Sequence, residues 1–249
     1  MNGTEMTENN LRIDGRKPEH LRDLSIETGY QPGPHGSVLV SWGENRVICS
    51  ASVEYKVPLF LRGKGRGWVT AEYDMLPGSG DKRIRRDRTG NGIKGRSQEI
   101  QRLIGRCLRQ CVNMSYMPDK TVTIDCDVLV ADGGTRVASI AGSVVALRLA
   151  LLRLLSSGQL EKDPWKQYLG ALSLGVVKGV PLLDLCYEED SKADMDMNIV
   201  AAEDGKLIEI QASAEDDPVD HATVFKMASD AIEAIRELVI PALKDAAGD

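Results

Sequence analysis

The 249-residue sequence predicts an α+β fold, or a mixed-sheet α/β fold. Segments that alternate apolar and polar residues, as half-buried strands do, occur in both halves of the chain. Apolar residues at helical spacing occur between and after them, so the order is strands, helix, strand, helix, strands and a final helix. No linker separates these segments, which favours one layered unit over two independent ones.

The N-terminal half contains four predicted strands and one predicted helix. "SVLVSW" and "RVICSASV" alternate within residues 37–55 and are joined by "GEN", which predicts a hairpin. "GWVTAEYDML" and "TVTIDCDVLV" predict two further strands. Between these two, "SQEIQRLIGRCLRQCV" has helical spacing, and Ser97 stands where an N-cap is expected. Cys107 and Cys111 lie on its apolar face, which indicates core packing rather than metal binding.

The C-terminal half continues with helices and paired strands. "VASIAGSVVALRLALLRLL" predicts a helix from about Val137 that is buried on most sides. The Asp-Pro pair at 163–164 predicts a cap and the first turn of a short helix. "LGALSLGVVKGVPLLDLCY" predicts two strands, and the segment around 204–205 predicts a hairpin. A final helix is expected over 220–243, with Pro241 near its end. The strand–helix–strand blocks of the two halves suggest an internal duplication.

Composition narrows the classes of protein. The polar start of the chain lacks an apolar signal segment, so we expect a disordered tail at 1–10 and a single domain at 11–249. No apolar run reaches about 18 residues without a charge, which argues against a membrane span. Five cysteines without a C-x-x-C pair indicate a reduced, cytoplasmic protein. Three histidines outside any metal-ligand spacing argue against a zinc site or a Ser-His-Asp triad.

A glycine-rich turn, "GGTR" at 133–136, lies between a predicted strand and the buried helix. Its glycines let backbone N–H groups converge on an anion, Thr135 adds a hydroxyl, and Arg136 adds a planar guanidinium. The helix that follows contributes the positive end of its dipole. These parts fit a phosphate site. Taken alone, however, the motif favours a tight turn whose arginine pairs with Asp132 or a neighbour.

Basic residues cluster although the net charge is −6. Arg96 lies at the predicted start of a helix, where a cation opposes the dipole unless an anion compensates it; a surface position is the alternative. "KRIRRDR", at 82–88, lies in a glycine-rich segment, 77–95, that is expected to be a long exposed loop. This segment suits RNA or DNA phosphates through salt-sensitive contacts, and a solvated loop explains it equally well.

Carboxylates gather in "EEDSKADMDMN". In an extended segment, Asp194, Asp196 and Asn198 share one face, and Asp190 reaches it through a turn at 191–192. Oxygen ligands without histidine or cysteine favour Mg²⁺ or Mn²⁺ over zinc. An acidic strand edge that blocks pairing is the alternative. Together, the phosphate, metal and basic features indicate phosphoryl transfer on a nucleic acid.

Five segments resemble the ribonuclease PH family and follow the family's order. They are "RIDGRKPEHLR", "GWVTAEYDMLP", "GRSQEIQRLIGRCLR", "IDCDVLVADGGTRVASIAG" and "LDLCYEEDSKADMDMNIV". The resemblance runs from about Leu11 to Leu243. It implies a ribosomal-S5-domain-2-like fold, a duplicated βαβα arrangement with mixed sheets and with helices packed between and outside them. It also implies a homohexamer, a trimer of dimers.

The resemblance implies an activity and a set of site residues. The activity is phosphate-dependent 3′-to-5′ trimming of tRNA precursors and other RNA 3′ ends, including rRNA processing. Inorganic phosphate is the co-substrate, a nucleoside diphosphate leaves, and the reaction is reversible. The implied residues are Arg96, Gly134, Thr135 and Arg136 for phosphate, Asp190 and Asp196 for catalysis and Mg²⁺ or Mn²⁺, Asp194 as a helper, and Arg83 and Arg86 for tRNA.

The chain departs from the family pattern at three places. Gly78 stands where an arginine usually follows "MLP", although Arg85 and Arg88 supply charge nearby. "QASAE" at 211–215 replaces Gln-Gly-Thr-Ala-Glu, and Val219 stands where a phenylalanine is usual. None of these changes touches the implied phosphate or metal residues. Two other classes stay open: a hydrolytic metal-dependent nuclease, and a non-catalytic RNA-binding ring subunit.

Overall fold

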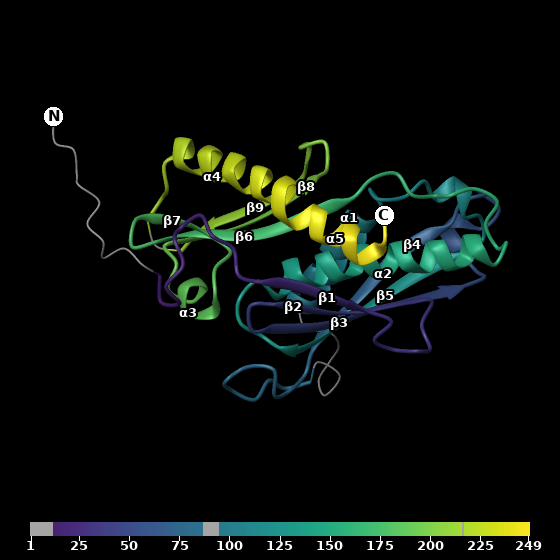
Figure 1. Ribbon diagram of the computed structural model, residues 1–249, viewed down its shortest axis with the longest axis horizontal. Helices are drawn as coiled ribbons and strands as arrows, with labels where there is room; N and C mark the ends of the chain where they lie inside the picture. Colours follow the sequence, from purple (N-terminus) through teal and green to yellow (C-terminus); the bar gives the residue numbers. More distant parts are fainter. Residues whose placement is uncertain (1–11, 87–94, 216) are drawn as a thin grey trace.

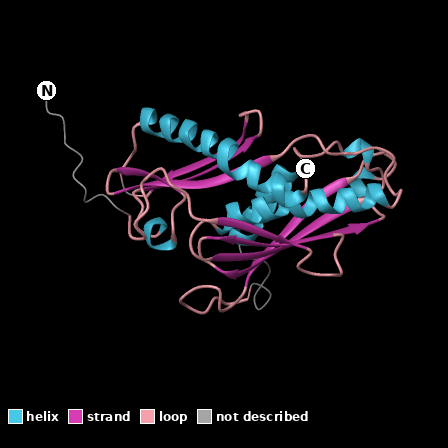
Figure 2. Ribbon diagram, in the orientation of Figure 1, coloured by secondary structure: helices cyan, strands magenta, loops and turns pink. Residues whose placement is uncertain are grey.

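A computed structural model describes residues 12–86, 95–215 and 217–249. The expected tail at 1–10 and Arg88 of the basic segment lie outside these residues. The described chain forms two β-sheets with helices packed between and outside them (Figures 1 and 2). This arrangement matches the predicted α+β architecture.

The first sheet has five strands in the order β1-β2-β3-β5-β4. Their bounds are Leu24–Thr28 (β1), Gly36–Trp42 (β2), Asn45–Glu54 (β3), Trp68–Met75 (β4) and Thr121–Val130 (β5). The predicted β2–β3 hairpin is confirmed, whereas β1 was not predicted. Strand β4 runs parallel to β5 and the other pairs are antiparallel, so the sheet is mixed. A parallel pair needs a crossover, which helix α1 (Gly95–Leu108) provides.

The second sheet has four strands in the order β7-β6-β8-β9, and all its pairs are antiparallel. Their bounds are Leu169–Val177 (β6), Val180–Leu183 (β7), Met195–Ala202 (β8) and Leu207–Ala214 (β9). The predicted hairpin around 204–205 is confirmed as β8–β9, and the two strands predicted in "LGALSLGVVKGVPLLDLCY" pair with each other as β6 and β7. A short helix, α3 (Tyr187–Asp190), connects the two strand pairs, and Asp190 is its last residue. Both halves of the chain therefore run from strands through a helix to further strands and a closing helix.

Helix α2 (Thr135–Ser156) joins the two halves (Figure 1). It contacts β2, β3 and β5 of the first sheet and β6 of the second. Among the described helices it alone is long and apolar enough to cross a membrane, but 83% of its most apolar window is buried, which identifies it as a core helix. Gly142 permits the close packing, because a Cβ there would lie 2.6 Å from Cys49 Sγ. One continuous buried cluster includes side chains of both sheets.

The C-terminal helix is longer than predicted. It comprises α4 (His221–Ala234), a π-helical turn (Ile235–Val239) and α5 (Ile240–Ala247), so it continues past Pro241. Proline lacks an N–H and disrupts a continuous α-helix. Here it occupies the first turn after the π-helical segment, in which the N–H of Ile240 bonds to the carbonyl of Ile235.

Three local predictions have different outcomes. Helix α1 begins at Gly95, so Ser97 is a buried helical residue and not the N-cap. No helix follows Asp163; its carboxylate instead accepts a hydrogen bond from the N–H of Trp165, which forms an isolated bridge with Val112. Cys107 is buried in the core as predicted, and burial raises its pKa to about 12. The described chain also contains two 3₁₀ helices, Leu59–Leu61 and Met114–Tyr116.

Candidate active site

A cavity of about 420 Å³ contains every residue predicted to bind phosphate or metal. Its walls come from the starts of α1 and α2, from β6 and β8, from the end of α3 and from the residue after β9. The lining residues are Arg96, Gly134, Thr135, Arg136, Ser173, Asp190, Ser191, Lys192, Ala193, Asp196, Asn198 and Glu215. The fold therefore brings together two motifs that lie far apart in the sequence. We call this cavity the phosphate pocket.

The glycine-rich turn leads into α2 at the edge of the phosphate pocket. Gly133 and Gly134 have φ values of 65° and 71°, a left-handed conformation that glycine adopts without steric cost. Helix α2 begins directly afterwards at Thr135, and no described side chain caps its N-terminus. The N–H of Val137 donates to the carbonyl of Gly134, so the N–H groups of Thr135 and Arg136 and the positive end of the dipole are what this helix start offers an anion.

The hydroxyl of Thr135 is held by Tyr73 of β4. Their oxygens are 2.9 Å apart, and both side chains are buried. Burial raises the pKa of Tyr73, so the phenol keeps its proton and is able to donate it to Thr135. The hydroxyl hydrogen of Thr135 is then free to point toward an anion in the pocket. Tyr73 could not be predicted from the sequence, because it lies 62 positions from Thr135 and only the fold brings the two side chains together.

Tyr73→Phe removes this hydrogen bond without changing the shape of the side chain. A neutral hydrogen bond contributes about 1 kcal/mol, so we expect the KM for phosphate to rise about fivefold. Initial rates measured against phosphate concentration, at saturating RNA, test this. An unchanged KM would show that the phenol does not orient Thr135 for binding.

Two arginines bring positive charge to the phosphate pocket. The guanidinium of Arg136 donates to Gln211 Oε1 at 2.6 Å and lies 3.6 Å from Glu99 Oε1. Of the alternative in which Arg136 pairs with Asp132 or a neighbour, the structure shows neighbours, Gln211 and Glu99, as the partners. Arg96 is exposed at the second position of α1, and its charge acts on the carboxyl of Asp190. A cation at a helix start, facing a pocket with another cation, is what an anion site requires.

The two aspartates interact electrostatically. Partial burial raises the pKa of Asp190, and the negative charge of Asp196 raises it further, against the opposing effect of nearby arginines. A divalent cation between them would relieve this repulsion. Asn198 adds an amide oxygen to the same wall, and oxygen ligands are those that Mg²⁺ and Mn²⁺ prefer. Among the described residues, no three His, Cys, Asp or Glu side chains lie together in a group that could hold a metal ion.

Asp194, the expected helper, does not line the pocket. It precedes β8, and its Oδ2 accepts a hydrogen bond of 3.1 Å from the N–H of Gly179 in the β6–β7 turn. Its carboxylate therefore contacts the β6–β7 turn, and no role in the pocket is assigned to it.

Six lining residues were not predicted as site residues: Ser173, Ser191, Lys192, Ala193, Asn198 and Glu215. The shared face of Asp196 and Asn198 was recognised, but no role was assigned to the amide. Ser173 is opposite Asn198 in the β6–β8 register, which sequence alone does not supply. Lys192 brings a third positive charge close to the aspartates.

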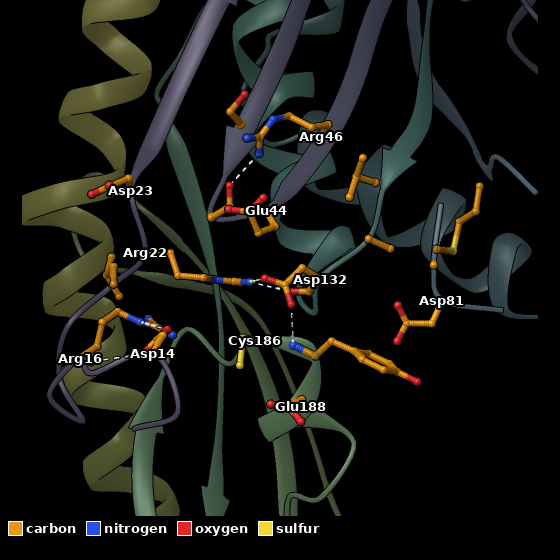
Figure 3. A pocket seen from close by; sticks show the side chains of 18 of the residues that line it. Asp14, Arg16, Arg22, Asp23, Glu44, Arg46, Asp81, Asp132, Cys186 and Glu188 are labelled. Atoms are coloured by element: carbon orange, nitrogen blue, oxygen red, sulfur yellow. Dashed lines mark hydrogen bonds and ion pairs between the residues drawn. The ribbon is translucent and has the colours of Figure 1, made fainter. Parts of the chain in front are cut away.

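A larger cavity, of about 1360 Å³, is lined by Arg16, Arg22 and Asp132 among other residues (Figure 3). Its lining carboxylates outnumber its cations, and pairs such as Arg16–Asp14 and Arg22–Asp132 are already bonded. That charge balance suits an anion less well than the phosphate pocket does. Arg83 and Arg86 are exposed on the segment that leads from β4 toward α1 and line neither cavity.

The chain is similar in sequence to known proteins. Profiles for the "3′ exoribonuclease family", domains 1 and 2, match residues 20–152 and 167–234. A ribonuclease PH of Neisseria meningitidis serogroup C is 50% identical over 92% of this chain and 94% of its own length. The Bacillus mycoides ribonuclease PH is 46% identical over 96% and 98%.

Solved structures share the fold. A chain of the Archaeoglobus fulgidus exosome with RNA bound to the active site aligns with a TM-score of 0.78 and 21% identity, over 92% of this chain and 91% of that one. Rice Rrp46 aligns with a TM-score of 0.77 and 17% identity, over 96% and 100%. The predicted α+β fold of the duplicated βαβα kind is thereby confirmed.

Proposed function

Since the chain belongs to the 3′ exoribonuclease family that includes ribonuclease PH, we propose that the phosphate pocket holds inorganic phosphate beside the 3′ end of an RNA. The protein is a phosphorolytic 3′-to-5′ exoribonuclease of tRNA processing. The observation that carries the site assignment is the meeting of Arg96, Thr135 and Arg136 with Asp190 and Asp196 in one cavity.

The proposed mechanism follows from the pocket's charges. Arg96, Arg136, the hydroxyl of Thr135 and the N–H of Gly134 bind phosphate. A phosphate oxygen attacks the terminal phosphodiester, forming a P–O–P bond and breaking the bond between phosphorus and the preceding 3′ oxygen. That oxygen takes up a proton, a nucleoside diphosphate leaves, and the RNA is one nucleotide shorter. The reverse reaction adds a nucleotide from a diphosphate.

The arginines act mainly by neutralising charge and fixing geometry. Phosphate and RNA are both anions, so their approach is repulsive in water. Arg96 and Arg136 offset that repulsion and hold the attacking oxygen close to the scissile phosphorus, and such positioning accounts for much of the rate of phosphoryl transfer. Asp190 and Asp196 would hold Mg²⁺ or Mn²⁺, whose charge would stabilise the leaving 3′ oxygen.

We assign RNA contact to Arg83 and Arg86, which are exposed and distinct from the phosphate pocket. The Arg83→Ala, Arg86→Ala double variant should bind tRNA more weakly, with a salt dependence reduced by about one unit of slope per lost phosphate contact. Binding measured from low to high salt tests this. Lys206→Ala, which removes an exposed cation of the β8–β9 turn, is the control. Equal losses in both variants would contradict a specific role for the loop arginines.

The oligomeric state and the cellular compartment of the protein are also proposals. We propose a homohexamer, a trimer of dimers, acting in the cytoplasm on tRNA precursors and on rRNA 3′ ends. A single domain over 11–249 is supported by the continuous core that joins both sheets. Native mass spectrometry should show six copies of the 27.2 kDa chain; a monomer would contradict the ring.

The function is tested by incubating the protein with a 3′-extended tRNA, with and without inorganic phosphate. Trimming should require phosphate. Phosphate-independent trimming that releases monophosphates would identify a hydrolytic nuclease instead. Absence of trimming under both conditions would favour a non-catalytic RNA-binding subunit.

A further inference from the structure

A buried arginine outside the phosphate pocket is tied to a buried carboxylate. The Arg22 guanidinium donates to both oxygens of Asp184, with Nη2 2.6 Å from Oδ1 and Nε 3.1 Å from Oδ2. Asp184 is fully buried and also accepts a hydrogen bond of 3.1 Å from the indole N–H of Trp42. Burial alone would lower the pKa of Arg22, but the bonds to Asp184 and Asp132 raise it, so the guanidinium stays charged.

The remaining edge of this guanidinium contacts the turn that precedes α2. Its Nη1 donates to the Asp132 carbonyl and lies 3.2 Å from Asp132 Oδ2, while Nη2 lies 3.3 Å from the carbonyl of Gly133 (Figure 3). Asn45, at the start of β3, donates to the same Gly133 carbonyl at 2.6 Å and accepts from the N–H of Asp132 at 2.8 Å. Two side chains from separate elements therefore hold one carbonyl.

A Gly-Gly peptide needs such external restraint. Neither Gly133 nor Gly134 has a Cβ, so rotation of the peptide between them meets little steric resistance. A side chain at Gly133 could not supply the restraint, because its Cβ would lie 2.8 Å from the carbonyl oxygen of Leu185. The orientation of this peptide must therefore be set by hydrogen bonds to it.

The held carbonyl determines where the neighbouring N–H points. The peptide is trans, so its C=O and N–H point in opposite directions. Arg22 and Asn45 bind the C=O of Gly133, which directs the N–H of Gly134 away from them, and Gly134 lines the phosphate pocket. We infer that Arg22 and Asn45 are positioning residues that aim the Gly134 N–H at inorganic phosphate. The inference rests on the proposed function of this pocket.

Two variants test the inference from different elements. Arg22→Lys keeps a charge for Asp184 but lacks the planar fork that reaches the turn. Asn45→Ala removes the second donor. In each variant we expect the KM for phosphate and its calorimetric dissociation constant to rise about 10- to 100-fold, the range expected for losing one hydrogen bond to a charged group. The KM for RNA should stay within about twofold, since only phosphate binding is affected.

Arg12→Lys is the matched control. Arg12 is equally buried and binds the carboxylate of Glu189 and the carbonyls of Leu183 and Asp184, but it does not contact the turn. It should lower Tm as Arg22→Lys does while leaving the phosphate KM unchanged. Wild-type phosphate KM in both Arg22→Lys and Asn45→Ala would overturn the inference. The inference would also be overturned if the KM for phosphate rose in all three variants in proportion to their loss of Tm. If the wild-type protein trimmed RNA at a rate independent of inorganic phosphate, the proposed function itself would be refuted.

Discussion

Asp196→Asn is expected to reduce kcat on the order of 10²–10³-fold, the loss typical of removing one group that stabilises transition-state charge. Asparagine keeps the shape of the side chain but removes one of the three carboxylates that line the phosphate pocket, which are Asp190, Asp196 and Glu215. RNA binding should survive, because the change removes a negative charge near an anionic ligand. Single-turnover trimming and tRNA binding, measured on the same preparation, test the two effects separately.

Asp194→Asn is a closely matched control for this variant. It makes the same chemical change two residues away, on a side chain that bonds to the N–H of Gly179 and lies outside the pocket. We expect near-wild-type turnover from it. If Asp196→Asn kept turnover as well, Asp196 would have no part in the mechanism.

The same substitution should change the titration of Asp190. Burial raises the pKa of Asp190 first and the charge of Asp196 raises it further. Asp196→Asn removes only the second effect, so the pKa should fall but stay raised by burial. Because only the ionised carboxylate binds a cation, Mg²⁺ affinity of the wild type should fall as pH decreases through the raised pKa. Carboxyl-carbon NMR titration tests this. If the pKa of Asp190 does not fall in Asp196→Asn, the two carboxylates do not interact electrostatically.

Arg96→Ala should raise the KM for phosphate on the order of 10- to 100-fold, because a hydrogen bond from a charged group contributes about 1.5–3 kcal/mol. Arg96 occupies the second position of α1, and its charge reaches both Asp190 and Tyr73. Part of the lost rate should therefore return at high phosphate. Initial rates at saturating RNA, with phosphate varied, measure the effect.

Arg106→Ala controls for loss of an arginine from the same helix. Its guanidinium is exposed and pairs with Glu209 at 2.7 Å. A surface ion pair contributes little to stability, about 0–1 kcal/mol, and this one lies outside the phosphate pocket. Its phosphate KM should equal that of the wild type. An Arg96→Ala enzyme with the same unchanged KM would mean that Arg96 is a surface residue without a ligand.

Local patterns predicted most of the elements. Alternation and the short "GEN" turn predicted β2 and β3, and helical spacing predicted α1 and α2. The glycine-rich turn and the acidic segment were both recognised as candidate parts of a site. These predictions succeed because strand and helix periods and turn chemistry are properties of neighbouring residues.

Contacts between distant segments could not be predicted in the same way. Arg22 lies 110 positions from Asp132, and nothing around it marks it as a partner of the turn. Ser173 enters the pocket through the β6–β8 register, and Tyr73 through the packing of β4 near α2. The bond from the N–H of Gly179 to Asp194 is likewise a contact with another segment, and the spacing of the aspartates does not reveal it.

The identity of the attacking group is the central claim, and isotope transfer tests it most directly. The protein is incubated with a 3′-extended tRNA, Mg²⁺ and radiolabelled inorganic phosphate, and the released nucleotides are separated. We predict nucleoside diphosphates that carry the label in the β position, in amounts equal to the nucleotides removed. Unlabelled nucleoside monophosphates would show that water is the nucleophile and would contradict phosphorolysis.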